Sequence, residues 1–338
     1  MKRLNKTLAI AALAAAAFAT TAFAAGEPDP VLKVDYLNSD LPADYFHANF
    51  RTSLDPFPQA KIDALGKLGY STKVSREGMD QIHAAGGADF TAKQFAWILE
   101  KMKEIGGATP ANITVLDLRG ETHGLIDGNV FMSWIPNNYV NEGKPTEEVV
   151  AIEKKLVDSL KGKGTVEMYS TDDKWGADTA KPKLSFKSPK IETEEELVKS
   201  AGASYYRLAT TNHFRPDDHE VDLYVDFMKK LPGDRWLFIH CYAGEGRTTN
   251  FMVMTDIFKN YKQVSFDDIA ARHGLIGPVD VRAELAVTGK THYKMKASVE
   301  RRIFLEQFYL YAKDTGFSKP WSEWVRARGI SLKYYPDF

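Results

Sequence analysis

The chain has 338 residues, with 44 lysines and arginines against 45 aspartates and glutamates, so its formal net charge is −1. This balance excludes the uniformly basic surface with which proteins bind nucleic acid or anionic membranes, so any polyanion must meet a local concentration of positive charge. The single cysteine, Cys241, excludes an internal disulfide.

The N-terminus has the pattern of a cleaved secretory signal. Three basic residues precede an Ala/Leu-rich run from Leu8 to Phe18, and Ala22-Phe23-Ala24 is an A-x-A cleavage site. A membrane anchor is the alternative, but the apolar run is short and dominated by alanine. We expect residues 1–24 to be removed after Ala24, leaving residues 25–338 as a periplasmic or secreted protein without membrane attachment. The charge balance then becomes 41 − 45 = −4.

The first half of the mature chain predicts an α/β body. The segment from Gly26 to Asp55 is rich in Pro, Asp and Asn and is expected to be extended. Thr91-Ala92-Lys93-Gln94 is a capping box, and the apolar residues after it keep helical spacing as far as Gly106-Gly107. Ile113–Arg119 then has the pattern of a strand. Helix, short loop and strand in this order are typical of an α/β layer.

Between about Gly124 and Ile191 the pattern changes to short β-like runs with polar flanks. An acidic helix, from about Glu147 to Leu160, lies among them. We expect a small β-rich subdomain, inserted at about 124–191 in the α/β body. Its lysines, including Lys187 and Lys190, form either a rim that faces an anion or an ordinary solvated edge.

After this region the α/β pattern returns. A second capping box, Thr193-Glu194-Glu195-Glu196, begins a short helix, and Ser204–Ala209 follows as a strand. A loop from Thr210 to Asp218 leads to an amphipathic helix, which the apolar residues from Val221 to Leu231 predict.

The stretch from Trp236 to Thr249 is the most informative. An apolar strand ends in His240-Cys241, a loop with two glycines follows, and Arg247 precedes a second apolar run. Strand, glycine-containing loop and helix together aim backbone N–H groups and a helix N-terminus at one anion. The same dipoles favour the thiolate of Cys241, the nucleophilic form, and the planar fork of Arg247 suits two phosphate oxygens. A buried structural cysteine is the alternative, but an unpaired thiol in an exported protein is poorly explained that way.

These residues resemble a known family. His-Cys-x5-Arg-Thr resembles the signature of the cysteine-dependent, protein-tyrosine-phosphatase-like superfamily, and the fuller His-Cys-x-Ala-Gly-x-Gly-Arg-Thr-Thr is similar to its bacterial phytases, which dephosphorylate myo-inositol hexakisphosphate. Asn49-Phe50-Arg51 resembles a family segment whose Arg contacts substrate. The stretch from Asp117, also expected to bind substrate, to Gly124 resembles the family's Asp-Leu-Arg-x-Glu-x-His-Gly. The resemblance implies an α/β fold with a central sheet flanked by helices and a small partial β-barrel beside the active site.

The resemblance also implies a two-step mechanism without a metal or organic cofactor. Cys241 attacks phosphorus in line and forms a cysteinyl-phosphate, which water then hydrolyses. Thr248 stabilises the thiolate and His240 orients the loop. Arg247 and the loop amides hold the equatorial oxygens. The loop residues are Tyr242, Ala243, Gly244, Glu245 and Gly246, of which Glu245 is expected to point outward because its carboxylate would repel phosphate.

One position departs from the family pattern. The family carries Thr-Asp-His-x-x-Pro, whose Asp is the general acid, but this chain has Asn212 at the acid's place. An amide cannot donate a proton to an alkoxide, and general acid catalysis is worth about a hundred- to ten-thousand-fold. Asp217 is the first candidate to replace the acid, followed by His213 and Asp218.

Three functions follow from these observations. The leading one is an exported inositol polyphosphate phosphatase, because lysines near the predicted site favour a small polyanionic substrate. A protein tyrosine phosphatase is the enzymatic alternative. Asn212 motivates a third, a member that binds inositol phosphates without efficient turnover. The lysines in question are Lys187, Lys190, Lys294 and Lys296.

Overall fold

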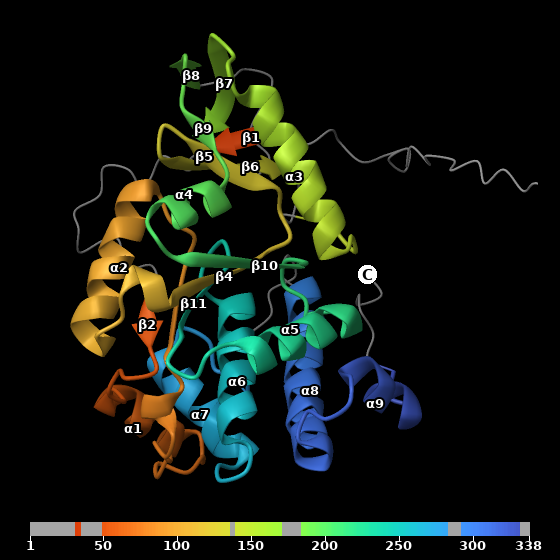
Figure 1. Ribbon diagram of the computed structural model, residues 1–338. Helices are drawn as coiled ribbons and strands as arrows, with labels where there is room; N and C mark the ends of the chain where they lie inside the picture. Colours follow the sequence, from red (N-terminus) through yellow and green to blue (C-terminus); the bar gives the residue numbers. More distant parts are fainter. Residues whose placement is uncertain (1–30, 35–48, 136–138, 171–183, 283–291, 332–338) are drawn as a thin grey trace, which may run out of the picture.

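The computed structural model describes residues 31–34, 49–135, 139–170, 184–282 and 292–331 (Figure 1). Two sheets organise these residues. The one that carries the signature strand lies among most of the helices, and the second sheet lies above it in the view of Figure 1. The expected signal, residues 1–24, falls outside the described residues. No helix in the described part of the chain is long and apolar enough to cross a membrane.

The sheet with the signature strand has five strands in the order β10-β4-β11-β3-β2. Four of them are parallel, and β2 runs antiparallel to β3. Parallel strands bring their carboxyl ends to one edge, so the ends of β4, β10 and β11 meet where a ligand is expected. The bounds are β2 Arg51–Thr52, β3 Ala84–Gly87, β4 Ile113–Arg119, β10 Ser204–Thr210 and β11 Trp236–His240.

Both faces of this sheet are covered by helices, which explains why β4 and β11 read as nearly continuous apolar runs. Alternate residues face alternate layers. Ile113, Val115, Trp236 and Phe238 pack with α2 (Ala92–Gly106) and α4 (Glu194–Ser200). On the other face, Leu116 and Ile239 belong to a larger core with α5 (Asp218–Lys230), α6 (Gly246–Asn260), α7 (Phe266–Ile276), α8 (His292–Thr315) and α9 (Trp321–Ala327). A further helix, α1 (Gln59–Lys67), follows β2.

The second sheet corresponds to the β-rich region expected at about 124–191. It has six strands in the order β8-β7-β1-β6-β5-β9, and α3 (Thr146–Leu160) packs Val157 and Leu160 onto it. β1 comes from before the expected range yet pairs with both β6 and β7. The described strands form an open sheet, with β8 and β9 at its edges, and no closed barrel. The bounds are β1 Val31–Val34, β5 His123–Ile126, β6 Asn129–Trp134, β7 Thr165–Ser170, β8 Leu184–Lys187 and β9 Ile191–Glu192.

Both capping boxes expected from the sequence are confirmed. The hydroxyls of Thr91 and Thr193 accept from the backbone N–H groups three residues later, at the starts of α2 and α4. α5 begins at Asp218, earlier than the expected Val221, because the side chain of Asp217 caps it. Asp217 is also the first candidate for the general acid.

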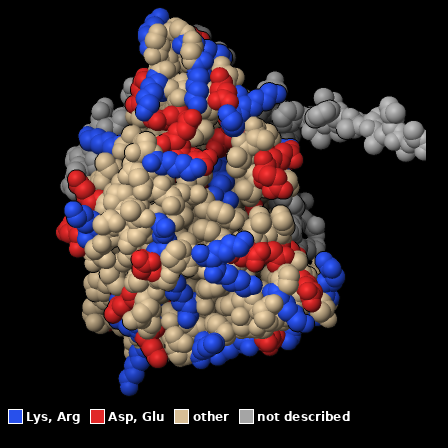
Figure 2. All heavy atoms as spheres, viewed as in Figure 1, with Lys and Arg blue, Asp and Glu red and all other residues tan. Residues whose placement is uncertain are grey.

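Charges of both signs are interspersed on the face of the molecule seen in Figure 2, in keeping with the net charge of −1. On α3 and α4 they pair within one helix, as in Lys154–Asp158 and Lys199–Glu195. The positive charge that an anion site needs must therefore be concentrated elsewhere.

Candidate active site

Cys241 lies where β11 ends and a loop leads into α6. Its side chain is 3 % exposed, and the hydroxyl of Thr248, in the first turn of α6, donates to Sγ at 3.3 Å. The backbone N–H groups and the dipole at the N-terminus of an α-helix favour an anion, and α6 begins at this place. We call residues 241–247 the cradle.

The cradle passes close to the end of β3, and this requires a glycine. Gly244 has a φ of +69°, and a Cβ on it would lie 2.4 Å from the carbonyl carbon of Gly87. Asn49 Nδ2 donates to the carbonyl of Ala243 at 2.7 Å. Glu245 is exposed, as expected. Segments that precede the signature by well over a hundred residues therefore fix its shape.

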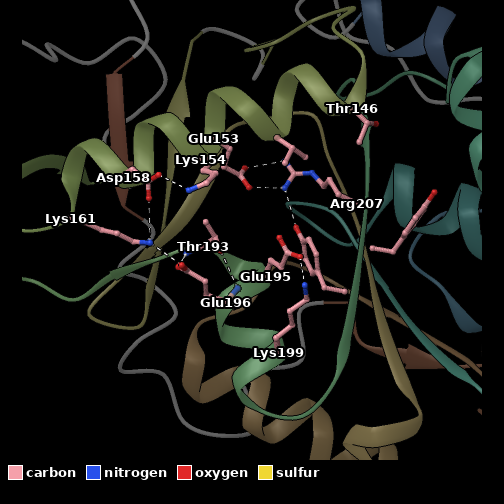
Figure 3. A pocket seen from close by; sticks show the side chains of 13 residues that line it. Thr146, Glu153, Lys154, Asp158, Lys161, Thr193, Glu195, Glu196, Lys199 and Arg207 are labelled. Carbon is pink, nitrogen blue, oxygen red and sulfur yellow. Dashed lines mark hydrogen bonds and ion pairs between the residues drawn. The ribbon is translucent and has the colours of Figure 1, made fainter.

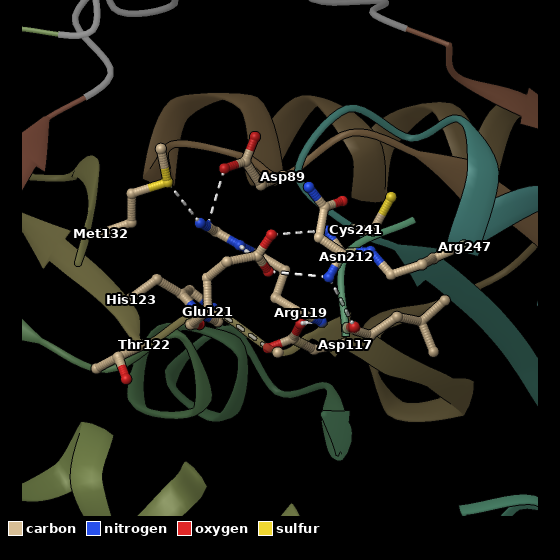
Figure 4. Close-up of polar contacts among 12 residues, drawn as sticks. Asp89, Asp117, Arg119, Glu121, Thr122, His123, Met132, Asn212, Cys241 and Arg247 are labelled. Atoms are coloured by element: carbon tan, nitrogen blue, oxygen red, sulfur yellow. Dashed lines mark hydrogen bonds and ion pairs between the residues drawn. The ribbon is translucent and has the colours of Figure 1, made fainter. Parts of the chain in front are cut away.

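Arg247 is held in place by a carboxylate that the sequence did not single out. Its Nη1 and Nη2 form a bidentate pair with Glu121 at 2.9 and 2.8 Å, and Nη1 also donates to the carbonyl of Thr210 at 2.9 Å (Figure 4). Burial alone would raise the pKa of Glu121, but the charge of Arg247 lowers it to about 2. Arg247 is thus oriented before any substrate arrives. The one available signal for Glu121 was its place between Asp117 and Gly124.

Arg51 approaches the cradle from β2. It is 2 % exposed, and it donates to the carbonyl of Gly244 and to the hydroxyl of Thr249, both at 2.9 Å. Burial lowers the pKa of Arg51 to about 10, with Cys241 acting in the opposite direction, so the guanidinium is still charged at neutral pH. The structure gives Arg51 a part in holding the cradle; its contact with substrate stays a prediction.

Asp117 does not face the open side of the cradle, contrary to the expectation that it binds substrate. It is fully buried, and its Oδ2 accepts from Arg207 Nη1 at 2.7 Å and from the hydroxyl of Tyr205 at 2.6 Å. The reason is its parity along β4, which it shares with Val115 and which turns it toward the layer of α4.

Asp117 belongs to a buried polar network that joins the two sheets. His123, on β5, lies 3.2 Å from each of the carboxylates of Asp117, Glu153 and Glu194. Arg207 bridges Asp117 to Glu153 at 2.7 and 3.2 Å. Burial alone would lower the pKa of His123, but Glu153 and Asp117 raise it well above its usual value, so the ring is charged.

Ligand atoms of Asp117, His123 and Glu194 lie within 4.8 Å of one another, which suggests a metal site. A metal ligand must be a neutral imidazole, whereas His123 is held in its charged form. Arg207 already supplies positive charge at Asp117. These residues fit an ion-pair network better than a metal centre.

His240 also faces the layer of α4. It is completely buried, with Nε2 2.8 Å from Oε1 of Glu194, and its ring lies 5.8 Å from that of Phe238 and 5.0 Å from that of Phe90. The carboxylate and the two rings fix the imidazole directly before Cys241.

Asn212 and His213 lie in the loop after β10, directly after Thr210 and Thr211, and the carbonyl of Thr210 accepts from Arg247 (Figure 4). Asn212 Nδ2 is 3.1 Å from Nε2 of His213, which has a φ of +69°. Burial, followed by the charges of Lys294 and Arg247, lowers the pKa of His213 to about 3. The ring is therefore neutral, and a neutral imidazole is a poor acid for an alkoxide.

The two aspartates that follow are engaged at the start of α5. Asp217 accepts from the N–H of Glu220 at 2.6 Å as the N-cap, and its own N–H donates back to the Glu220 carboxyl at 2.8 Å. Asp218 accepts from Arg215 at 3.0 Å and from Trp321 Nε1 at 2.9 Å. If Asp217 is the proton donor, its side chain must cap α5 and also protonate the leaving group.

α8 brings basic residues to the cradle. The guanidinium carbon of Arg301 lies 3.6 Å from the position that a Cβ on Gly246 would take, and Nη1 donates to the carbonyl of His213. Burial lowers the pKa of Arg301 to about 10, so it stays charged at neutral pH. Lys294 is close enough to act on His213, and Lys296 is exposed. Arg301 follows Lys294 by seven residues and so shares its helical face, a signal that could have identified it.

Lys187 and Lys190 belong to the second sheet. Lys187 ends the edge strand β8, and Lys190 lies in the connection to β9, with Nζ 2.8 Å from Glu192. Both are exposed. The contacts of the described residues do not join either lysine to the cradle.

A cleft of about 500 Å³ lies between α3, α4 and the edge of β10 (Figure 3). Its lysines are paired with carboxylates: Lys161 with Glu196 at 2.9 Å, and Lys199 with Glu195 at 2.6 Å. Since these charges are already neutralised, the cradle is the better place for a phosphate.

Comparisons with known proteins agree with this geometry. A family model for protein-tyrosine-phosphatase-like phytases, with the description "Inositol hexakisphosphate", matches residues 116–259. The structure of the PTP-like myo-inositol phosphatase from Mitsuokella multacida in complex with myo-inositol-(1,3,4,5)-tetrakisphosphate is 35 % identical, with a TM-score of 0.77 over 92 % of this chain and 50 % of that one. A PTP-like phytase from Bdellovibrio bacteriovorus is 27 % identical, with a TM-score of 0.62 over 89 % of this chain and 97 % of that one.

Among curated proteins, the effector protein hopD2 of Pseudomonas syringae pv. tomato is 29 % identical over 231 residues, which are 67 % of this chain and 49 % of the effector. The chain thus spans about half the length of this relative and of the Mitsuokella protein. The matched residues 116–259 include Asp117–Gly124, Glu121 and the whole cradle, and the surrounding fold is shared with the solved structures. The chain belongs to the protein-tyrosine-phosphatase-like phytase family.

Proposed function

We propose that this protein is an exported phosphatase that hydrolyses myo-inositol polyphosphates through a cysteinyl-phosphate. The observation that carries the proposal is Cys241 in the floor of an anion-binding loop, with Thr248 3.3 Å from its sulfur and Arg247 fixed by Glu121. A relative of 35 % identity whose structure contains an inositol tetrakisphosphate supports the substrate class. Because that relative is about twice as long, the substrate of the whole protein is part of the proposal.

In the first step, the thiolate of Cys241 attacks phosphorus opposite the inositol oxygen. The sulfur–phosphorus bond forms as the phosphorus–oxygen ester bond breaks, and the inositol oxygen takes up a proton. The cradle amides, the N-terminus of α6 and Arg247 face the equatorial oxygens, where negative charge is greatest. In the second step, water attacks phosphorus, the sulfur–phosphorus bond breaks, and inorganic phosphate leaves.

The charges around the cradle favour a polyanion over a single phosphate group. Arg51, Arg247 and Arg301 are each close enough to Cys241 for its charge to act on them. Lys294 adds a cation beside His213. In a protein of nearly neutral balance, this concentration is matched by a ligand with several phosphates. A phosphotyrosine side chain would use the cradle and leave Lys294 without a ligand phosphate.

We include export in the proposal because the N-terminal pattern is that of a signal cleaved after Ala24. The test is the N-terminal sequence of the protein recovered from the periplasm or medium of its host. A chain that begins at Ala25 supports export, and a full-length chain retained in the cytoplasm contradicts it.

The activity is tested by phosphate release from myo-inositol hexakisphosphate, from mildly acid to neutral pH, beside Cys241→Ser. A matched control is Lys154→Met, which changes an exposed charge on α3. Release that disappears in Cys241→Ser and persists in the control is the expected result. Tight binding without release identifies a binding protein, and faster release from a phosphotyrosine peptide identifies a tyrosine phosphatase.

A further inference from the structure

Three consecutive carbonyl groups of the cradle accept hydrogen bonds from segments that come much earlier in the sequence. They are the carbonyls of Tyr242, Ala243 and Gly244. Their donors, in the same order, are the N–H of Asp89 at 3.2 Å, Nδ2 of Asn49 at 2.7 Å and Nη1 of Arg51 at 2.9 Å. All three donors lie in β2 or within two residues of β2 or β3, so these two strands support one side of the cradle.

A hydrogen bond to a carbonyl group also orients the N–H group of the next residue. In a planar trans peptide the C=O and the N–H point in opposite directions, and no peptide bond in the described part of the chain is cis. The three bonds therefore turn the N–H groups of Ala243, Gly244 and Glu245 away from the donors on the side of β2 and β3. Backbone N–H groups that point to one side of a loop in this way form a concave binding site for an anion.

Asn49 has both the backbone and the side chain that this contact requires. Its φ is +60°, a left-handed conformation that asparagine adopts more readily than most other residues. Its own carbonyl accepts from Nη1 of Arg51 at 2.7 Å, and the pairing of β2 with β3 fixes the segment beside the cradle. Phe50 lies between them and stacks on Phe238 of β11, with 6.4 Å between the ring centroids. The side-chain amide of Asn49 is thus held in a fixed place.

We propose that Asn49 is a positioning residue for the bound phosphate: by holding the carbonyl of Ala243 it keeps the N–H of Gly244 turned toward the anion. The carbonyl of Ala243 has no second donor among the described residues. Gly244, with its φ of +69°, restricts rotation of this peptide less than any other residue type would. Without Asn49 the peptide can turn its carbonyl oxygen, which repels phosphate, toward the site. The inference rests on the proposed function in taking the cradle as the phosphate site.

Of the three donors, Asn49 is the one whose substitution changes the orientation of the cradle and nothing else in its charge. The bond from Asp89 comes from its backbone, so it survives a change of side chain. Arg51 makes two further hydrogen bonds, and its charge interacts with Cys241, so its loss would alter the electrostatics of the site. Asn49 is neutral. Asn49→Gly removes the donor and still permits the left-handed backbone.

Binding of inorganic phosphate, measured by isothermal titration calorimetry at neutral pH, tests the proposal without any turnover. We expect Asn49→Gly to bind phosphate about ten-fold more weakly than the unmodified chain. The matched control is Asp127→Gly, in the turn between β5 and β6. Asp127 also has a positive φ, of +50°, and its side chain also bonds to a distant backbone group, the N–H of Lys190 at 2.8 Å. The control should bind phosphate as tightly as the unmodified chain.

Thermal melting without phosphate shows whether Asn49→Gly folds. A folded variant with unchanged affinity for phosphate overturns the proposal, and so does an equal loss of affinity in Asp127→Gly. If Asn49→Gly does not fold, Asn49→Asp keeps the size of the side chain but cannot donate when ionised. It should bind phosphate more than about ten-fold more weakly, and unchanged affinity again overturns the proposal. If phosphate binding depends on Asn49 as expected but the unmodified chain releases none from myo-inositol hexakisphosphate, the proposed activity fails and this inference stands.

Discussion

At the scale of single residues, Asn212 is the position that we expect to limit the rate of this site. By its resemblance to the family pattern it takes the place of the general acid, and it follows Thr210, whose carbonyl accepts from Arg247, by two residues. His213 is neutral, and Asp217 caps a helix. An inositol alkoxide is a poor leaving group unless it is protonated. The loss of the acid should therefore lower kcat most on substrates with such leaving groups.

Asn212→Asp is therefore expected to raise kcat on inositol polyphosphates, by about a hundred-fold or more. Aryl phosphates, whose leaving groups need little protonation, should gain much less. The measurement is kcat on both substrate types. Intact mass of the starting protein must confirm that Asn212 is still an amide, since deamidation would create the same aspartate. An equal gain on both substrates, or none on either, contradicts the role of this position in proton donation.

At the scale of elements, the start of α5 decides what Asp217 can do. Its carboxylate accepts from the Glu220 N–H at 2.6 Å, and the Glu220 carboxyl accepts from the Asp217 N–H at 2.8 Å. Asparagine is as good an N-cap as aspartate, whereas alanine is not. Two substitutions of Asp217 therefore distinguish its role as the helix cap from a role as the proton donor.

Asp217→Asn should leave the free energy of unfolding nearly unchanged, and Asp217→Ala should lower it by about 1 kcal/mol. If Asp217 donates the proton, both variants lose kcat on alkyl phosphates and less on aryl phosphates. Denaturant unfolding and kcat on the two substrate types are the measurements. A normal kcat in Asp217→Asn shows that Asp217 serves only as a cap.

Glu220, in the first turn of α5, makes the stability of the fold depend on pH. Burial, and then the charge of Asp217, raises the pKa of Glu220 from 4.5 to about 8. Between these values the folded protein keeps a proton that the unfolded chain releases, so this group makes stability fall as pH rises from about 4.5 to about 8.

Glu220→Gln removes this titration and can still accept from the Asp217 N–H. The variant should therefore gain in stability relative to the unmodified chain between about pH 5 and about pH 9, by an amount on the order of a few kcal/mol. Urea unfolding of both proteins at each pH measures the difference between their free energies of unfolding. If this difference in free energy is the same at both pH values, Glu220 does not hold its proton across this range.

At the scale of the whole molecule, the two sheets are joined by buried charge as well as by apolar packing. Arg207 of β10 donates to Asp117 on β4, to Glu153 on α3, and to the carbonyls of Arg119 and Glu121, which lead into β5. Removing one member of such a network leaves the others buried without their counter-charge.

Arg207→Met should therefore lower the free energy of unfolding by about 3–5 kcal/mol. The matched control is Lys154→Met, which breaks a pair whose side chains are 72 % and 47 % exposed and should cost less than about 1 kcal/mol. Denaturant unfolding of both variants gives the comparison. Equal losses would mean that the junction of the sheets depends on apolar packing and not on this network.

The local features of this protein could be read directly from the sequence. The strand, loop and helix around Cys241, the two capping boxes and the β-rich region all follow from the nature and spacing of neighbouring residues. Such signals are short-range, because backbone hydrogen bonding, capping and alternation depend on residues only a few positions apart.

The tertiary structure decided which distant residues meet at the cradle. Glu121 and Arg247 are 126 positions apart, and Arg301 reaches Gly246 only because α8 packs beside α6. Asp117 faces the layer of α4 because of its parity along β4, which lies between β10 and β11, and β1 joins the second sheet from outside the expected range. These outcomes depend on which strands pair and which helices cover them, and that is set by burial over the whole chain, which no local pattern encodes.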